Sequence, residues 1–467
     1  MGISQEWSQF PATYRETEAR TVARWIRAGE SGSVVGLTGV GRTTFLEFLC
    51  YRLDRLQEYL APYPHPIHLI PVDLYNLPDN HLATFYRILL RSFYEQNDRF
   101  KSSIQQTIHE LYRKVEAAQD PFLSQSALRE LLTLFHDQEI RVVLVMNRFD
   151  RFCETATPQM TATLRGLRDG FKETLSYIMG MTQEIVYLTD MESIAPLRGI
   201  LDTHICRIGP LSESDARHMI YRQTHYGADP IPEQAMQQLL QLSGGYPSLL
   251  RVLCHWWMNE SQNVPVYAWG ESLLARRNCQ HRLRDIWQNL TEEEQFTLVE
   301  LVQEPVKSGE KRGQPSKDER AAASVLQRLV RRGICRQEGE GWVVVGELIT
   351  AYARQAVGQG RGRVWLDEQT GIIYQGRSRV DGLQPLVHTL LTFFLTRPHE
   401  RHSHTELIEA VWPDDISKEG VSTEALYQVV RGARKAIESS TSKPRYLISW
   451  RGQIEGGYQF FPEGRPG

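Results

Sequence analysis

The chain has 467 residues, 41% hydrophobic and 23% charged, with a formal net charge of −3; this fits a globular protein of about two to four domains and excludes a surface that is basic throughout, so any DNA-binding face must be local. No apolar run approaches the ~18 residues of a membrane helix, and the N-terminus lacks a basic-then-apolar signal. The six cysteines are scattered without a C-x-x-C pair, which excludes a disulfide framework or zinc site and predicts a cytoplasmic protein with no membrane partner.

Residues 1–210 alternate between short apolar runs and longer amphipathic segments. The runs resemble buried strands, and segments such as residues 45–60 and 126–138 have helical periodicity. Alternation of this kind predicts a parallel sheet with helices on both faces, which is an α/β domain. The predicted strands are residues 33–37, 65–74, 141–147 and 184–189.

The rest of the chain predicts three further domains. Residues 211–279 have a helical pattern that a Gly-Gly pair interrupts, as at a turn between two helices. Residues 280–357 contain two or three helical segments followed by a hairpin pattern, which is the order of a winged helix. A glycine-rich linker at residues 358–363 leads to a last domain, residues 364–463, with strand, helix and hairpin patterns.

The sequence GLTGVGRT at residues 36–43 follows the first apolar run and precedes a helical segment. It fits the phosphate-binding loop G-x-x-x-x-G-K-[ST] at every fixed position but the lysine. Glycines in such a loop let backbone N–H groups surround phosphates, and the hydroxyl of Thr43 can bind Mg²⁺. We expect ATP or ADP with Mg as cofactor, contacted by Gly36, Thr38, Gly39, Val40, Gly41, Arg42, Thr43 and Thr44.

Arg42 stands where this loop has its lysine. A guanidinium group is wider than an ammonium group, planar, and set at a different reach. Phosphate binding should survive, because the backbone does much of it. Positioning of the γ-phosphate in the transition state should suffer, and catalysis depends on that positioning.

The second element of the site departs in the same direction. Asn147 follows the apolar run where a P-loop ATPase has an aspartate for Mg²⁺, and Arg148 stands where a glutamate commonly orients water. An amide removes a charge from the metal site, and an arginine cannot accept a proton. Asp150 lies three residues beyond the strand end and is a poor substitute ligand. These departures predict that the protein is not a competent enzyme, and we assign no catalytic residue.

A guanine-nucleotide site is an alternative. The sequence NRFD at residues 147–150 also resembles the N-K-x-D motif with which GTPases read guanine. A GTPase needs D-x-x-G between the two motifs, and the nearest candidate, residues 73–76, lacks the glycine. The sequence therefore favours the adenine nucleotide.

Four segments together resemble the STAND/AAA-type signalling ATPases: the P-loop, the strand ending in MNRFDRF, PLSESDA at residues 210–216 and SGGYP at residues 243–247. In that family the last two segments belong to a helical lid. The resemblance covers residues 10–355 and implies a nucleotide-controlled change in domain arrangement or self-association. It also implies that the nucleotide site includes Tyr14 and Arg15 against the adenine, Asn147, and Tyr246 and Pro247 of the lid.

The C-terminal residues resemble the effector domain of OmpR/PhoB-type response regulators. The matching pieces are residues 385–398, 404–412, 426–437 and 444–460. The family's ending R-Y-I-x-T-x-R-G-x-G-Y is nearly present from Arg445 to Tyr458, with two extra residues. The resemblance implies a winged helix that binds double-stranded DNA.

The helical segment at residues 426–437 supports DNA binding independently. An apolar residue recurs every three or four positions, which predicts one buried stripe with a basic face outside it. Arginine and glutamine side chains can read bases, and wing arginines suit phosphate or minor-groove contact. A solvated basic helix in a protein-interaction domain is the alternative. The candidate DNA-binding residues are Gln428, Arg431, Arg434, Lys435, Arg445 and Arg451.

The sequence thus predicts a multidomain protein with an α/β P-loop NTPase core and a helical lid, followed by two winged-helix domains. We expect a DNA-binding transcription regulator whose module binds nucleotide and hydrolyses it poorly or not at all. An active ATP-driven STAND switch and a scaffold subunit of a larger defence or mobile-element complex are the alternatives. Expected partners are double-stranded DNA, a second copy of the chain through the NTPase-like module, and another protein.

Overall fold

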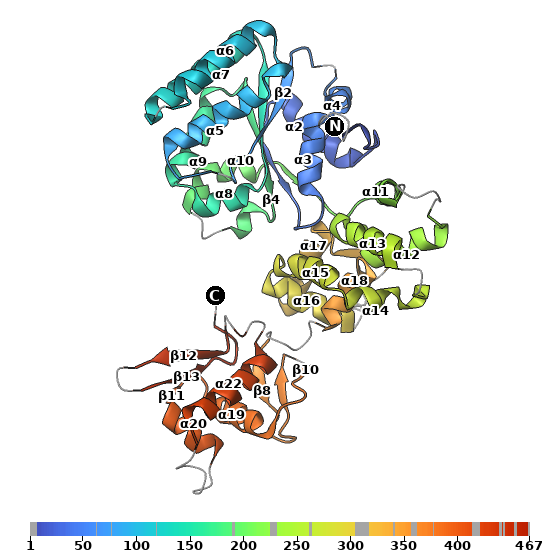
Figure 1. The fold of residues 1–467 in the computed structure, drawn as a ribbon, viewed down its shortest axis with the longest axis vertical. Helices are drawn as coiled ribbons and strands as arrows, with labels where there is room; N and C mark the ends of the chain where they lie inside the picture. The colour runs from blue at the N-terminus through green and yellow to red at the C-terminus, as the bar shows by residue number, and fades with distance from the viewer. Residues whose placement is uncertain are drawn as a thin grey trace. The chain divides into compact units, whose positions relative to one another are not determined.

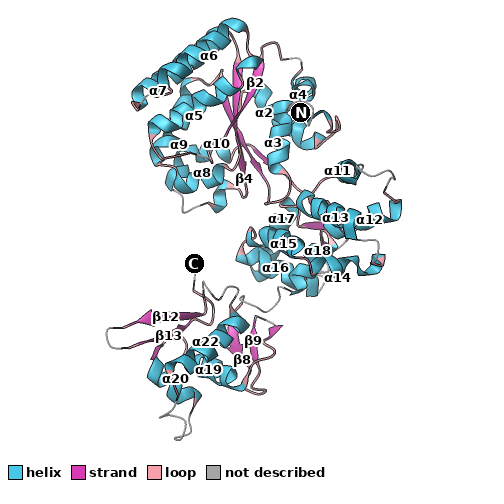
Figure 2. Ribbon diagram, viewed as in Figure 1, coloured by secondary structure: helices cyan, strands magenta, loops and turns pink. Residues whose placement is uncertain are grey.

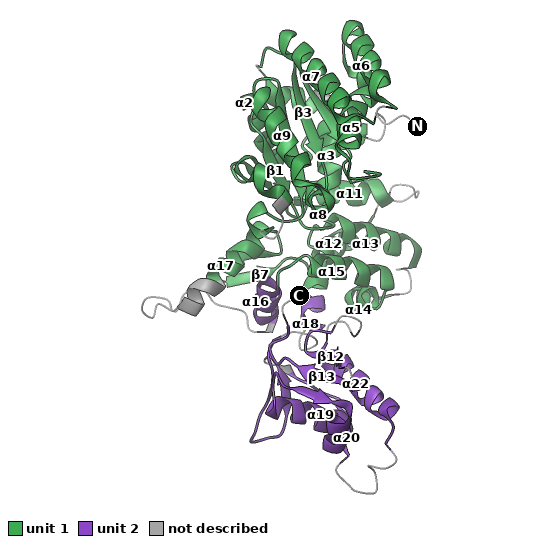
Figure 3. Ribbon diagram, turned by 90° about the vertical axis from the view of Figure 1, so that its left-hand side faces the viewer, with its two compact units in different colours: residues 1–291, 307–349 green, residues 292–306, 350–467 purple. Residues whose placement is uncertain are grey.

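The computed structural model of the protein divides into two compact units, residues 1–291 with 307–349 and residues 292–306 with 350–467 (Figure 3). The predicted linker falls mostly outside the described residues, and the predicted domain boundaries remain predictions. Among the described residues, every helix is too short or too polar to cross a membrane. The structure describes residues 7–61, 63–75, 77–117, 119–188, 192–224, 231–260, 264–303, 317–339, 341–355, 362–376, 378–412, 421–438, 441, 444–452 and 455–465.

A parallel five-stranded sheet forms the centre of the first unit, with strand order β2-β3-β4-β1-β5 (Figure 1). The strands are short and mostly buried on both faces, as in a sheet covered by helices on each side. The glycine-rich loop therefore leaves β1 with neighbouring strands on both sides. The strands are β1 Gly32–Val35, β2 Ile67–Val72, β3 Arg141–Met146, β4 Leu175–Met181 and β5 Ile205–Arg207.

Helices cover both faces of this sheet, which confirms the predicted α/β class (Figure 2). One face carries α2 Glu16–Ala28, α3 Arg42–Tyr51 and α4 Leu53–Leu60. The other carries α5 Leu82–Glu95, α6 Ser102–Val115, α7 Pro121–Asp137, α8 Phe149–Thr155, α9 Pro158–Gly170 and α10 Arg198–Leu201. The short helices η1 Asn97–Arg99 and η3 Glu192–Leu197 belong to the same unit.

One strand prediction is wrong. The described residues of the segment 184–189, which are 184–188, do not form a strand, because Ile185–Tyr187 is the 3-10 helix η2. The central strand is instead β4, residues 175–181, which the sequence did not single out. Strand β4 needs a glycine at position 180, beneath the P-loop helix. A Cβ there would lie 2.6 Å from Leu46 Cδ1 of α3.

The lid and the first winged helix follow in the predicted order. The lid contains α11 Glu213–Thr224, α12 Glu233–Ser243, α13 Pro247–Glu260, η5 Val266–Ala268 and α14 Trp269–Leu274. The segment predicted as the first winged helix contains α15 Arg277–Gln288, α16 Glu292–Gln303, α17 Lys317–Arg331, the antiparallel hairpin of β6 Cys335–Glu338 and β7 Gly341–Val344, and α18 Glu347–Gln355. Of these elements, α16 and the part of α18 from residue 350 on belong to the second compact unit.

The second unit contains the predicted C-terminal domain. Its helices pack around one core between two small antiparallel sheets, ordered β10-β9-β8 and β11-β13-β12. Ser403 caps α20 through a capping box with Glu406. The elements are β8 Val364–Leu366, β9 Ile373–Gln375, β10 Ser378–Arg379, α19 Pro385–Thr396, β11 Arg401–Ser403, α20 His404–Val411, α22 Thr423–Ile437, β12 Leu447–Arg451 and β13 Gly456–Phe460.

Candidate functional site

The P-loop connects β1 to α3 and has the backbone that its glycines predict. Gly39 and Gly41 have φ angles of +86° and +91°, a region that residues with a side chain rarely adopt. A Cβ on Gly39 would also lie 2.3 Å from Ser248 Oγ of α13. The loop thus needs glycine at these positions both for its turn and for the close approach of the lid.

Arg42 is directed onto its own loop. Its Nη1 donates to the carbonyl oxygen of Gly36 at 3.1 Å, and its Nε donates to Asn147 Oδ1 at 3.3 Å. The residue is only 9% exposed. Burial lowers the pKa of Arg42, while the negative charge of Asp150 opposes that shift. The guanidinium group is therefore held by the loop and by the strand end.

Asn147 connects the two halves of the predicted site at the end of β3. Its Nδ2 donates to Thr43 Oγ1 at 2.8 Å, while its Oδ1 accepts from Arg42. Gly180 leaves room for this amide, since a Cβ there would lie 2.9 Å from Asn147 Oδ1. Arg148 instead adopts a left-handed backbone and lies over the Tyr75 ring at 5.1 Å. The structure thus brings Arg42, Thr43 and Asn147 together, and turns Arg148 toward β2's end.

Asp150 is a site residue whose role the sequence did not reveal. It is 4% exposed, and its carboxylate accepts hydrogen bonds from the backbone N–H of Thr182, at 2.8 Å, and from the Thr182 hydroxyl. Within the described part of the chain its Oδ1 has no hydrogen-bond partner. The first turn of α8 and the end of β4 therefore place one buried carboxylate near Arg42. A small cavity lies beside Tyr14, and neither Asn147 nor Asp150 lines it. The two side chains are therefore not placed to recognise a guanine base in that cavity.

Arg15 ties the end of β5 and the lid to the P-loop. Its Nη2 donates to the carbonyl oxygens of Val40, at 2.7 Å, and Gly209, at 3.0 Å. Its backbone N–H donates to Asp215 Oδ2 of α11 at 3.1 Å. The side chain is buried. Arg15 thus fixes the loop, the end of β5 and the lid relative to one another, whatever it contributes to a bound base.

The lid turn after α12 contacts the P-loop directly. The Ser248 N–H donates to the Gly39 carbonyl oxygen at 3.1 Å, and Pro247 lies against Gly41. The buried hydroxyl of Tyr246 donates to the Gly333 carbonyl oxygen of the first winged helix at 3.2 Å, and its predicted place near the nucleotide stays a prediction. The turn therefore contacts the loop on one side and the first winged helix on the other.

Four predicted residues line one small cavity of about 30 Å³ beside the P-loop. The guanidinium carbon of Arg222 lies 4.4 Å from the Phe10 ring centroid at this cavity. A volume of this size holds about a water molecule. A base bound here would need side chains such as Arg222 to move. The predicted residues that line it are Tyr14, Gly41, Thr44 and Pro247.

The residues around the loop fit a nucleotide phosphate better than a tightly held metal. Ser248 Oγ is buried beside Gly39 and, among the described residues, has no hydrogen-bond partner, which suits a phosphate oxygen or its water. Thr43 offers a hydroxyl for Mg²⁺, and Asn147 offers an amide where a carboxylate would be stronger. The loop would hold the phosphates of ATP or ADP, and Thr43 would hold Mg²⁺.

The C-terminal helix α22 presents a polar face. The predicted stripe of Leu426, Val430, Ala433 and Ile437 is buried. Gln428, Arg431 and Lys435 are exposed, and they line a groove of about 700 Å³ between α22 and the connection from β10 to α19. Because the apolar stripe faces the core, these three polar side chains lie on the surface of the domain.

The other three candidate arginines have different surroundings. Arg434 is half-buried, and its Nη2 donates to the Leu447 carbonyl oxygen at 2.8 Å, so it already holds the wing. Arg445 contacts Glu292, and its Nε donates to the Arg465 carbonyl oxygen at 3.2 Å. Arg451 is exposed at the end of β12.

A buried carboxylate anchors this wing. Glu438 accepts hydrogen bonds from the backbone N–H groups of Arg445, Tyr446 and Leu447 at 2.7 to 2.9 Å. It is 3% exposed. The sequence shows Glu438 only as an acidic residue in a basic segment, and its role appears once the hairpin folds back on α22.

Several solved structures are similar to a large part of this chain at low sequence identity. The Walker-type ATPase of Pyrococcus abyssi is 14% identical with a TM-score of 0.44, over 73% of this chain and 95% of that one. The ADP form of the ORC2 protein of Aeropyrum pernix is 12% identical with a TM-score of 0.40, over 73% and 93%. A RuvB mutant of Thermotoga maritima is 15% identical with a TM-score of 0.33, over 73% and 94%. The P-loop NTPase fold is assigned here from strand order and loop.

No curated protein matches this chain. The C-terminal part gives a specific result, because residues 382–460 match the family described as "Transcriptional regulatory protein, C terminal". The match includes α19, α20, α22 and the hairpin of β12 and β13. The C-terminal winged helix of this chain is thus of the OmpR/PhoB type.

Proposed function

We propose that the protein is a cytoplasmic, DNA-binding transcription regulator whose P-loop module binds ATP or ADP and hydrolyses it poorly or not at all. The proposal of poor or absent hydrolysis rests on Arg42, because its guanidinium group bonds to Gly36 and Asn147. A phosphoryl-transfer site needs a cation placed on the γ-phosphate and a metal held by a carboxylate. Here the cation is engaged by the loop, and an amide stands at the end of β3.

The C-terminal domain supports the DNA-binding half. Its family match and the exposed side chains of Gln428, Arg431 and Lys435 suit a helix that enters the major groove. The exposed Arg451 on the wing suits a phosphate or the minor groove. Arg434 and Arg445 position the wing in this proposal, with direct DNA contact secondary.

The lid turn connects the P-loop with the first winged helix. Ser248 bonds to the P-loop and Tyr246 bonds to the first winged helix, only two residues away. Phosphates bound in the loop would meet the Ser248 hydroxyl, which lies beside Gly39. We propose that occupancy of the loop shifts this turn, and that the first winged helix, a partner protein or a second copy of the chain responds.

Phosphate release by the full-length protein tests this function against an active ATP-driven switch. We expect a fluorescent ATP analogue to bind, while phosphate release stays at the level of a blank without protein. Arg42→Lys and Asn147→Asp, alone and combined, should keep binding, and the combined variant should show the higher release. Wild-type turnover that Arg42→Ala abolishes would contradict the proposal.

Duplex binding by the same protein separates a regulator from a scaffold subunit. We expect salt-dependent binding to a pool of random-sequence duplex DNA. Failure to bind any duplex at low salt would favour the scaffold alternative.

A further inference from the structure

The small cavity beside the P-loop is enclosed by two segments that lie far apart in the sequence. One is the N-terminal segment, residues 7–15, and the other is the lid helix α11. Phe10 and Tyr14 line the cavity from the N-terminal segment, and Arg222 lines it from α11. Its volume is about 30 Å³. This space holds about a water molecule, so a nucleotide base does not fit into it.

Side chains on one face of α11 contact the N-terminal segment. Asp215, His218 and Arg222 are spaced by three and four positions, which places them along one face of a helix. Asp215 Oδ2 accepts from the Arg15 N–H at 3.1 Å. His218 Nε2 donates to the Gln9 carbonyl oxygen at 2.8 Å. The first two of these three residues therefore tie α11 to the segment through its backbone.

The third residue, Arg222, covers an aromatic face inside the cavity. Its guanidinium carbon lies 4.4 Å from the Phe10 ring centroid, which is the geometry of a cation–π contact. Burial raises the pKa of Tyr14, while the charges of Arg15 and Arg222 oppose that shift, so the guanidinium group acts on Tyr14 as well. Nucleobases also stack on aromatic faces. A base and the planar guanidinium group therefore compete for the same face of Phe10.

The N-terminal segment is held by the P-loop helix, whereas α11 is held by the lid. Arg52, at the end of α3, donates to the carbonyl oxygens of Trp7 at 3.0 Å and Phe10 at 2.9 Å. On α11, Arg217 donates to Glu233 of α12 at 2.8 Å. Opening of the cavity would therefore move α11 with the lid and leave Phe10 in place on the core.

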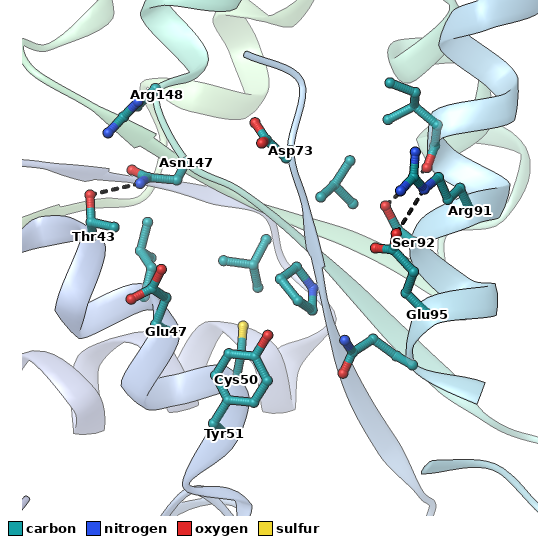
Figure 4. A pocket seen from close by; sticks show the side chains of 16 residues that line it. Thr43, Glu47, Cys50, Tyr51, Asp73, Arg91, Ser92, Glu95, Asn147 and Arg148 are labelled. Carbon is teal, nitrogen blue, oxygen red and sulfur yellow. Dashed lines mark hydrogen bonds and ion pairs between the residues drawn. The ribbon is translucent and has the colours of Figure 1, made fainter. Parts of the chain in front are cut away.

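The closure is confined to one side of α3. On another side of this helix a cavity of about 550 Å³ remains between α3, α5 and the carboxyl ends of β2 and β3 (Figure 4). Figure 4 shows Thr43 and Glu47 on the side of α3 that lines it. Neither Phe10 nor Arg222 is part of its lining. The small volume beside Tyr14 thus reflects the contact between α11 and the N-terminal segment.

We propose that Arg222 is a gate for the nucleotide base. In the closed structure its guanidinium group covers Phe10, and a base binds only after α11 has released the N-terminal segment. The apparent affinity for nucleotide is then the intrinsic affinity multiplied by the fraction of molecules that are open. This inference rests on the proposed nucleotide binding and adds how the lid controls it.

Isothermal titration of the full-length protein with ATP and with tripolyphosphate, both in Mg²⁺, tests the gate. Tripolyphosphate has phosphates but no base, so Arg222 does not compete with it. We expect Arg222→Ala to tighten ATP binding at least about threefold and to leave the affinity for tripolyphosphate unchanged, because loss of the cation–π contact favours the open state. Arg217→Ala removes the same charge from the same helix outside the cavity lining, so this control should change neither affinity.

The outcomes separate the gate from nucleotide binding itself. Unchanged ATP affinity in Arg222→Ala would overturn the gate and leave the proposed nucleotide binding standing. Weaker ATP binding would overturn it because Arg222 would then contact the nucleotide. An equal gain for tripolyphosphate, or the same gain in Arg217→Ala, would overturn it because the effect would not involve the base or this side chain. If neither wild type nor Arg222→Ala binds either ligand, the proposed nucleotide binding is wrong, and the gate with it.

Discussion

Arg42 differs from a P-loop lysine in the groups that its charged side chain contacts. The guanidinium group reaches the Gly36 carbonyl and the Asn147 amide at once, which a single ammonium group could not do in this planar arrangement. The amide at position 147 in turn donates to Thr43. The three residues therefore form one connected set, in which each side chain fits the others, rather than independent losses from a working ATPase.

Asp150 should matter for stability because it is the carboxylate whose charge offsets the burial of Arg42. Asp150→Asn leaves an acceptor for Thr182 but removes that charge. We expect a loss of about 1–3 kcal/mol in the free energy of unfolding, measured by urea denaturation.

Adding Arg42→Met to Asp150→Asn should recover part of the loss, because it removes the uncompensated buried charge. Asp137→Asn serves as the exposed control and should change the free energy by less than about 0.5 kcal/mol. A double variant no more stable than Asp150→Asn alone would show that the two side chains are not coupled.

The sequence predicts these residues unequally, for physical reasons. The positive φ angles at Gly39 and Gly41 follow from a local motif, so the loop is predictable. Distance from the strand end makes Asp150 look like a poor ligand, but the first turn of α8 brings it back to Thr182 at the end of β4. Tyr246 is expected near the nucleotide beside its neighbour Pro247, although adjacent side chains on a turn point in different directions.

At the scale of elements, the lid turn on the P-loop is the contact on which any nucleotide response depends. Gly39→Ala would force a Cβ to within 2.3 Å of Ser248 Oγ at a φ of +86°. We expect it to lower thermal stability by an amount equivalent to about 1–3 kcal/mol and to weaken binding of a fluorescent ATP analogue.

Gly166→Ala is the matched control for this change. Gly166 lies inside α9, and a Cβ added there would meet no atom within 4 Å beyond its own stretch of helix. Alanine should therefore stabilise the helix slightly, by about 1 kcal/mol or less. Equal effects of the two substitutions would mean that the lid does not approach the loop as closely as described.

Substitutions in the helix α22 should separate a loss of DNA binding from a loss of domain stability. Arg431→Ala and Lys435→Ala remove exposed charges, so each should weaken duplex binding and reduce the dependence of log Kd on log salt by about one. Arg434→Ala should instead lower the thermal stability of the C-terminal domain, because its guanidinium group bonds to Leu447 of the wing.

Two measurements on the same samples check these roles: fluorescence anisotropy gives the affinity for duplex DNA, and thermal unfolding gives the stability of the domain. Gln369→Ala, at an exposed position between β8 and β9 that does not line the groove beside α22, is the control and should change neither measurement. A variant of Arg431 or Lys435 that melts earlier but binds DNA normally would reverse the assigned roles.

Local sequence patterns do not predict every strand correctly. Residues 184–189 carry the β-branched and aromatic side chains of a strand, yet the described part of this segment is a short 3-10 helix. Strand β4 holds its place because its central position between β1 and β3 buries it fully, and this position is set by strand order rather than by local composition. The helices of the C-terminal domain are predictable, because each has its own periodic buried stripe.

At the scale of the whole molecule, the two compact units carry different parts of the proposal. The first contains the P-loop and the lid turn, and the second contains the OmpR/PhoB-type winged helix. Communication between them is a thermodynamic coupling, so nucleotide must change the affinity for DNA if the module controls the domain.

The most direct test is the affinity of the full-length protein for a pool of random-sequence duplex DNA at fixed salt, with ATP, with ADP and without nucleotide. The account predicts that one nucleotide state changes Kd by at least about fivefold and that Gly39→Ala abolishes the change. Identical Kd values and identical salt dependence in all three conditions, in protein shown to bind a fluorescent ATP analogue, would contradict it.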